Sequence, residues 1–192
     1  TDKYKEAVQN ALIKAMIEKA LPNIVDGTYV AVSDVSANGY SSARVTVENN
    51  MIVQVDLAEY DQNSVEKDFA LYEYEPSVNA NRELPWAFVA AQSPQVDMVT
   101  GATYSSRQYI QAVERALEKA SLVKRGGKYF DGVFQAKSKT DEYGYAIAKV
   151  SLKNDKMTSV ELKYIDADGK ERNFDTYEYE PSVRAYRELP EK

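Results

Sequence analysis

The chain has 192 residues, of which 44% are hydrophobic and 28% charged, a balance typical of a folded protein rather than a disordered one. Its formal net charge of −6, with no local cluster of Lys and Arg, argues against nucleic acid as a partner, because a phosphate backbone would be repelled. The sequence contains no Cys and no His, which excludes disulfides, Cys/His zinc sites, Cys-ligated iron–sulfur clusters and Ser-His-Asp or Cys-His nucleophiles.

A helix is the first element that the sequence predicts, over residues 1–22. Apolar side chains recur there at helical spacing and form one stripe. The residues of this stripe are Tyr4, Val8, Ala11, Leu12 and Ala15. The stripe needs a partner surface, because it would otherwise leave apolar area in water.

Three strands are predicted next. Residues 28–33 and 43–48 alternate β-branched and polar side chains, which is the pattern of half-buried strands. Asn49 and Asn50 predict a tight hairpin turn, because asparagine tolerates positive φ, and residues 51–60 are then the return strand. The sequence therefore predicts an antiparallel sheet.

A segment rich in Tyr and Glu follows the strands and ends at Pro85. Its aromatic side chains Tyr72 and Tyr74, and Trp86 after it, fit either core packing or stacking on a planar ligand. Residues 107–120 then predict a helix that packs on the sheet. Its apolar face consists of Tyr109, Val113, Ala116, Leu117 and Ala120. The predicted fold class is α+β, an antiparallel sheet with helices packed on it.

An internal repeat runs through the chain. The segment Phe69–Pro85 returns as Phe174–Pro190 with 13 of 17 residues identical, at an offset of 105 residues. The same offset carries Asp26 onto Asp131, and it needs no gap from end to end. We therefore interpret the chain as tandem 105-residue repeats.

The repeat divides the chain into three parts. Residues 1–22 are the terminal helix of a preceding repeat, residues 23–122 are a complete module, and residues 129–192 are a partial second module that lacks its last helix. The partial module needs a helix, and residues 1–22 need a sheet, so we expect the two to pack on each other. This contact would form within one chain or, head to tail, as self-association between chains.

Residues 97–106, with the sequence DMVTGATYSS, lie directly before the predicted helix of the complete module. A helix start offers unpaired amide N–H groups and the positive end of the helix dipole, and Gly101 allows the backbone to approach a ligand closely. The hydroxyl groups of the segment can bind phosphate oxygens. The same residues also allow a plain helix cap, with Ser105 and Gln108 in capping-box spacing. Residue types alone leave both interpretations open.

The segment resembles the flavin-attachment motif of the FMN-binding domain family, which includes the C and G subunits of the sodium-pumping and Rnf-type redox complexes and flavin lipoproteins of extracellular electron transfer. The matching residues are Asp97, Thr100, Gly101, Ala102, Thr103, Ser105 and Ser106. The resemblance implies that they bind FMN and that the FMN phosphate esterifies Thr103. Where many members carry a Thr-Pro-Gly-rich stretch, this chain has residues 72–77.

The resemblance also implies a function. The chain would be an electron carrier rather than a self-sufficient enzyme, matured by a flavin transferase and serving redox partner proteins or a quinone-linked reductase. Its location would be extracytoplasmic, secreted or held by an anchor outside this chain. The alternative is a non-redox repeat domain used for adhesion or ligand binding. No metal site is expected, because residues 166–169 lack most ligands of a calcium loop and predict a surface turn.

Overall fold

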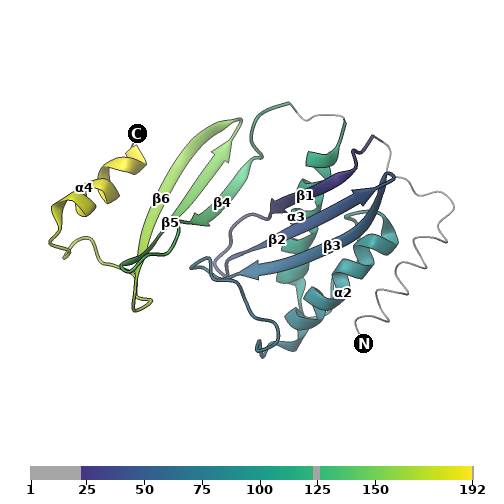
Figure 1. The fold of residues 1–192 in the computed structure, drawn as a ribbon, viewed down its shortest axis with the longest axis horizontal. Helices are drawn as coiled ribbons and strands as arrows, with labels where there is room; N and C mark the ends of the chain where they lie inside the picture. Colours follow the sequence, from purple (N-terminus) through teal and green to yellow (C-terminus); the bar gives the residue numbers. More distant parts are fainter. Residues whose placement is uncertain (1–22, 123–125, 192) are drawn as a thin grey trace. The chain divides into compact units, whose positions relative to one another are not determined.

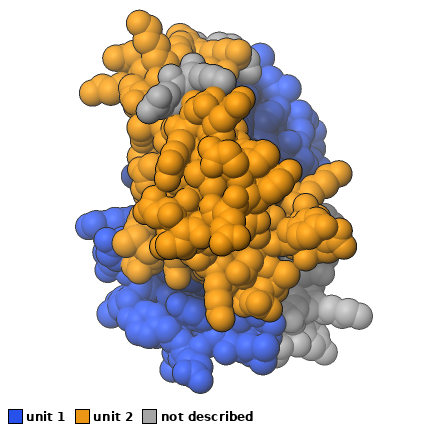
Figure 2. Space-filling model, turned by 90° about the vertical axis from the view of Figure 1, so that its left-hand side faces the viewer, with its two compact units in different colours: residues 1–33, 40–60, 66–125 blue, residues 34–39, 61–65, 126–192 orange. Residues whose placement is uncertain are grey.

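The computed structural model describes residues 23–122 and 126–191, which form two compact units (Figure 2). Unit 1 comprises the described residues 23–33, 40–60 and 66–122, and unit 2 comprises 34–39, 61–65 and 126–191. Two short loops therefore belong to unit 2 although the sequence places them in the complete module. Both loops bond to the first strand of unit 2: Val35 N–H donates to Val133 O (2.9 Å), and Gln135 Nε2 donates to Ser64 Oγ (2.9 Å).

Unit 1 contains an antiparallel sheet in the order β1 (Gly27–Val32), β2 (Tyr40–Glu48) and β3 (Met51–Tyr60) (Figure 1). The predicted turn joins β2 to β3, with Asn49 and Asn50 at φ 53° and 59°. The Asp26 carboxylate accepts both of their backbone N–H groups, at 2.9 and 3.0 Å. These bonds, to Asn50 and then to Asn49, lower the pKa of Asp26. The carboxylate thus fixes the turn to the start of β1.

Two helices, α2 (Glu75–Ala91) and α3 (Thr103–Ala120), pack on this sheet, α3 against β1 and β2 and α2 against β3. The core between sheet and helices is apolar and mostly inaccessible to solvent. Its fully buried members include Ala43, Val45, Val47, Ile52, Ala80, Phe88, Tyr109, Ala112, Val113, Ala116 and Ala120. The predicted α+β class is confirmed, and β3 and the end of α3 lie where the sequence places them.

The sequence did not predict α2. This helix begins after Tyr74 with Pro76 in its first turn, where the missing N–H of proline is harmless. Ala80, Leu84 and Phe88 follow at intervals of four residues and form its buried face. Pro85 lies inside the helix, so the proline that marks the end of the Tyr/Glu-rich segment does not end the element.

Unit 2 contains a second antiparallel sheet, β4 (Gly132–Lys137), β5 (Gly144–Lys153) and β6 (Lys156–Asp166), followed by α4 (Glu180–Glu188) and the 3-10 helix η1 (Leu189–Glu191). Its register matches unit 1 at a spacing of 105 residues: Gly27 pairs with Val47, and Gly132 pairs with Leu152. Each second hairpin also has a register shift, at Thr46/Val47 and at Ser151/Leu152.

The helix predicted over residues 1–22 lies outside the described residues, as does its predicted packing on unit 2. Within the described part of the chain, no helix is both long enough and apolar enough to cross a membrane.

Candidate functional site

The motif segment forms a tight loop that leads into α3. The Ala102 N–H donates to Val99 O (2.9 Å), and Gly101 has a φ of 81° in the left-handed region. A Cβ on Gly101 would lie 3.2 Å from the Cβ and Cγ of Pro76. Both the backbone conformation and the close approach of α2 therefore favour glycine at this position.

The helix starts earlier than the sequence predicts. It begins at Thr103, and its N-cap is Ala102, which makes no side-chain capping bond. Ser105 lies inside the first turn, and Gln108 accepts a hydrogen bond from Ser41 Oγ (3.2 Å). The capping-box interpretation is therefore wrong, because Ser105 is three residues too far along the helix to cap it.

The first turn of α3 presents free amide groups at the surface. Its first helical bond runs from Ser106 N–H to Ala102 O (2.9 Å), so the amides of the three preceding residues have no carbonyl partner in the helix. The turn contains no acidic side chain, and the positive end of the helix dipole is not compensated there. Thr103 and Thr100 are exposed beside these amides. This geometry suits an anion that carries a phosphate.

The two serines of the motif are used differently from the threonines. Ser106 is fully buried, and its Oγ accepts the N–H of Val99 (3.1 Å). Ser105 is also buried, and its Oγ lies 3.1 Å from Ser77 Oγ on α2. The Ser106 hydroxyl fixes the loop to α3, and the Ser105 hydroxyl joins α3 to α2. The other hydroxyl-bearing residues of the segment, Thr100, Thr103 and Tyr104, are exposed.

The start of α2 forms the other side of the loop. Tyr74, the N-cap of α2, donates its hydroxyl to Gly101 O (2.8 Å), and its side chain is half-exposed. Tyr72 is exposed as well, so neither tyrosine is a core residue. Sequence reasoning missed the Tyr74 contact, because 27 residues separate the two partners and no local pattern signals it.

Asp97, the first residue of the motif, is exposed and borders a hollow of about 670 Å³. The other residues lining this hollow are Ala87, Ala90, Ala91, Gln95 and Val96. Gln95 Nε2 donates to Glu114 Oε1 (3.0 Å), which fastens the segment to α3. The motif therefore extends from the side of α3 to its first turn, with the carboxylate at one end and Thr103 at the other.

A buried polar cluster lies under α3, six residues along the helix from Thr103. Glu59 Oε2 accepts Lys67 Nζ (2.8 Å), and the hydroxyl of the fully buried Tyr109 accepts Asn81 Nδ2 (3.0 Å). Burial and then the Glu59 charge raise the pKa of Tyr109 far above its usual value. Burial lowers the pKa of Lys67, but its bond to Glu59 and the charge of that carboxylate outweigh this effect and raise it.

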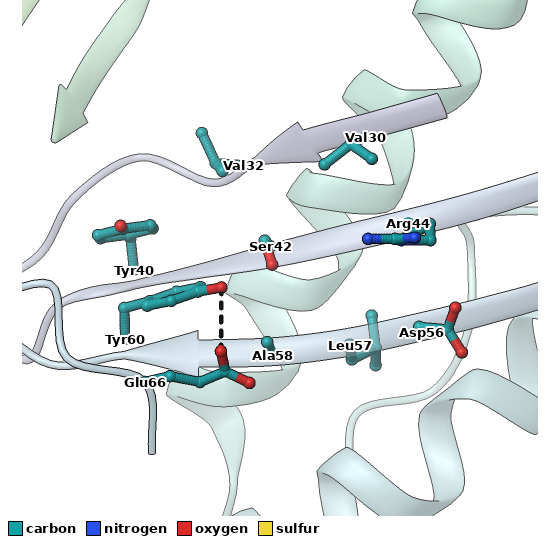
Figure 3. A pocket seen from close by; sticks show the side chains of 10 residues that line it. All are labelled: Val30, Val32, Tyr40, Ser42, Arg44, Asp56, Leu57, Ala58, Tyr60 and Glu66. Atoms are coloured by element: carbon teal, nitrogen blue, oxygen red, sulfur yellow. Dashed lines mark hydrogen bonds between the residues drawn. The ribbon is translucent and has the colours of Figure 1, made fainter. Parts of the chain in front are cut away.

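A second hollow, of about 450 Å³, lies on the outer face of the unit 1 sheet and contains no motif residue (Figure 3). The rings of Tyr40 and Tyr60 stack there at 4.9 Å, and Tyr60 donates to Glu66 Oε2 (3.4 Å). Arg44 and Asp56 are register partners at its other end. The motif residues therefore do not line this hollow, and they lie on the helix side of unit 1.

No cluster of three or more Asp and Glu side chains suited to a metal ion occurs in residues 23–122 and 126–191. The segment 166–169 is a turn, in which Asp166 Oδ1 accepts the N–H groups of Asp168 (3.0 Å) and Lys170 (2.9 Å). This carboxylate therefore accepts hydrogen bonds from the backbone of its own turn.

Comparison with known proteins supports a flavin-binding module. Residues 37–118 match the family model of the FMN-binding domain, and this range contains β2, β3, α2, most of α3 and the whole motif. A crystal structure of the CPE2226 protein from Clostridium perfringens is 23% identical, with a TM-score of 0.42, over 50% of this chain and 88% of that one. No curated protein matches the chain significantly.

Proposed function

We propose that unit 1 is an electron-transfer flavoprotein module that holds FMN through a phosphoester to Oγ1 of Thr103. The module works outside the cytoplasm between redox partner proteins, or with a quinone-linked reductase, and is not an enzyme by itself. The observation that carries this proposal is the exposed Thr103 hydroxyl at the uncapped start of α3, inside the region that matches the FMN-binding domain.

The residues present fit the phosphate of FMN. Three amides of the first turn of α3 are available to anionic oxygens, and the Thr100 hydroxyl is exposed near them. Gly101 keeps this loop packed against α2, since a Cβ there would press on Pro76. The absence of a carboxylate from this turn removes the side chain that would otherwise repel a phosphate.

Attachment requires a nucleophile and an activated donor. Oγ1 of Thr103 attacks the phosphorus of the FMN part of a flavin dinucleotide, the bond to the second nucleotide breaks, and that nucleotide leaves as its monophosphate. The hydroxyl proton is released to a base of the transferase. A separate flavin transferase is part of the proposal because the family that the motif resembles is matured by one, and the chain itself has no His or Cys that could activate Thr103.

Bound FMN supplies reversible one- and two-electron chemistry, which no side chain of this protein provides. The task of the chain is then to hold and orient the flavin. The Tyr74 hydroxyl and Ser106 fix the loop before the acceptor, and the Ser77–Ser105 pair joins the first turn of α3 to α2. A covalent link also keeps the cofactor on the protein in a dilute extracytoplasmic environment.

The test is the intact mass of protein produced together with a flavin transferase. We expect a gain of one FMN less one water, and no gain in Thr103→Val, which keeps the side-chain shape without the hydroxyl. Thr103→Ser keeps the nucleophile and serves as the matched control, so it should still gain the flavin. An unmodified mass in wild-type protein, beside a flavinylated standard from the same cells, would favour the non-redox alternative.

A further inference from the structure

The two sheets differ in how their apolar faces are covered. In unit 1 the residues that face α2 and α3 are buried except for the half-buried Leu57, and Ile52 is 0% exposed. At the matching position of unit 2, Met157 is 58% exposed. The other residues of this unit 2 face are only half-buried, and we call the whole set the open face: Ala148, Val150, Leu152, Met157, Val160 and Leu162. All six are apolar, as are their counterparts in unit 1.

The element that covers the unit 1 face is chiefly α3. It contacts β1 and β2, and its own face of Tyr109, Ala112, Val113, Ala116 and Ala120 is fully buried. Among the described residues of unit 2, the only element recorded against β6 besides β5 is η1, and α4 lies beside the sheet (Figure 1). The open face therefore has the composition and register of a helix-binding surface without an α3 equivalent in the described part of unit 2.

The sequence contains a segment that matches α3. Seven of the first 15 residues are identical to their counterparts 105 positions later, and most of those counterparts are buried in α3. The seven are Tyr4, Ala7, Val8, Ala11, Leu12, Lys14 and Ala15. One of the seven is a lysine that makes a polar contact in unit 1, where Lys119 Nζ donates to Val30 O (2.6 Å). At the offset of 105 residues, the counterparts of this pair are Lys14 and Gln135. The segment thus carries the side chains that cover such a face.

We propose that the open face is an interface that binds residues 1–22 of a second copy of this chain. Each copy carries one such segment and one such face, so a reciprocal pair covers both faces. Asn23, the residue that follows the segment, is fixed beside the end of α3, since its backbone O accepts the N–H of Leu122 (2.6 Å). Apolar burial drives the contact, as it does for α3 in unit 1.

The experiment compares two neighbouring substitutions in the full chain. Val8 corresponds to Val113, which is fully buried, and Gln9 corresponds to Glu114, which is exposed. Val8→Glu should turn an associated species into monomers in sedimentation and make amide exchange in β5 and β6 about tenfold faster. Gln9→Glu introduces the same side chain at a position outside the apolar stripe and should behave like wild type.

Exchange in β1–β3 and α3 is the internal standard, because an unchanged pattern there shows that Val8→Glu is folded. Adding a synthetic peptide of residues 1–22 to Val8→Glu should restore the slow exchange of β5 and β6. Equal exchange in the two variants, or no effect of the peptide, would overturn the proposed interface. The wild-type chain could be monomeric at all concentrations while slow amide exchange in β5 and β6 still depends on Val8. That result would show that the segment covering the open face does not come from a second copy.

Discussion

The hydroxyl of Tyr74 donates a hydrogen bond to the backbone carbonyl of Gly101 at 2.8 Å, and so joins the start of α2 to the loop that directly precedes Thr103. The bond is at the surface, where a hydrogen bond contributes about 1 kcal/mol or less to stability. It acts on the site chiefly by limiting the positions of the acceptor loop.

Removing this hydroxyl should therefore affect flavin attachment more than folding. Tyr74→Phe is expected to lower the initial rate of flavin incorporation several-fold and to change the free energy of unfolding by less than about 1 kcal/mol. Tyr72→Phe removes a hydroxyl from the same segment without touching the loop, and it is the control. Equal incorporation rates in both variants would show that the Tyr74 bond has no role in attachment.

Gly101 tests the shape of the loop. Gly101→Ala places a side chain at a φ of 81° and 3.2 Å from Pro76, so we expect a loss of about 1–2 kcal/mol in the free energy of unfolding, together with poor flavin incorporation. Gly126→Ala is the matched control, since a Cβ there meets nothing within 4 Å. Urea denaturation measures the first effect and flavin absorbance the second. Wild-type behaviour in both would refute the steric argument.

Ser106 tests whether a motif residue can stabilise the fold without contacting the cofactor. Its buried Oγ is the acceptor for the Val99 N–H, so Ser106→Ala should cost about 1–3 kcal/mol, the range for leaving a buried polar group unpaired. The same change at Ser93 should cost less, because Ser93 is half-buried and its Oγ accepts the N–H of the exposed Gln95 (3.0 Å). Comparable urea midpoints for the two variants would contradict the buried role of Ser106.

The stability of unit 1 should fall in alkali. Tyr109 and Lys67 both have pKa values raised by folding, so their contributions are complete below the unfolded values of about 10 and are lost as pH rises through the folded values. Tyr109→Phe removes the larger of these shifts and should flatten the decline in urea midpoint above about pH 10. An unaltered pH dependence in this variant would show that Tyr109 is not the titrating group.

The sequence predicts the sheet well because strand register depends on local features. Alternation defines the strands, and the Asn49-Asn50 turn fixes their pairing. The helix α2 was not predicted because Pro85 and the neighbouring tyrosines suggest an irregular segment. Its buried face depends instead on contact with β3, which is distant in the sequence.

The motif itself is readable from sequence, but the roles inside it are not. Thr103 and Ser106 are both hydroxyl residues at fixed motif positions, and only the fold exposes the first and buries the second. The contact of Tyr74 with Gly101 likewise depends on how α2 and α3 meet, which no spacing in the chain encodes.

The central claim is a phosphoester at one hydroxyl, and peptide mapping tests it most directly. Trypsin should release residues 83–107 as one peptide, because no Lys or Arg lies between Arg82 and Arg107. In protein produced with the transferase, fragmentation of this peptide should place one FMN on Thr103. Flavin on Thr100 or on another hydroxyl of the peptide, or no covalent flavin at all, would contradict the account.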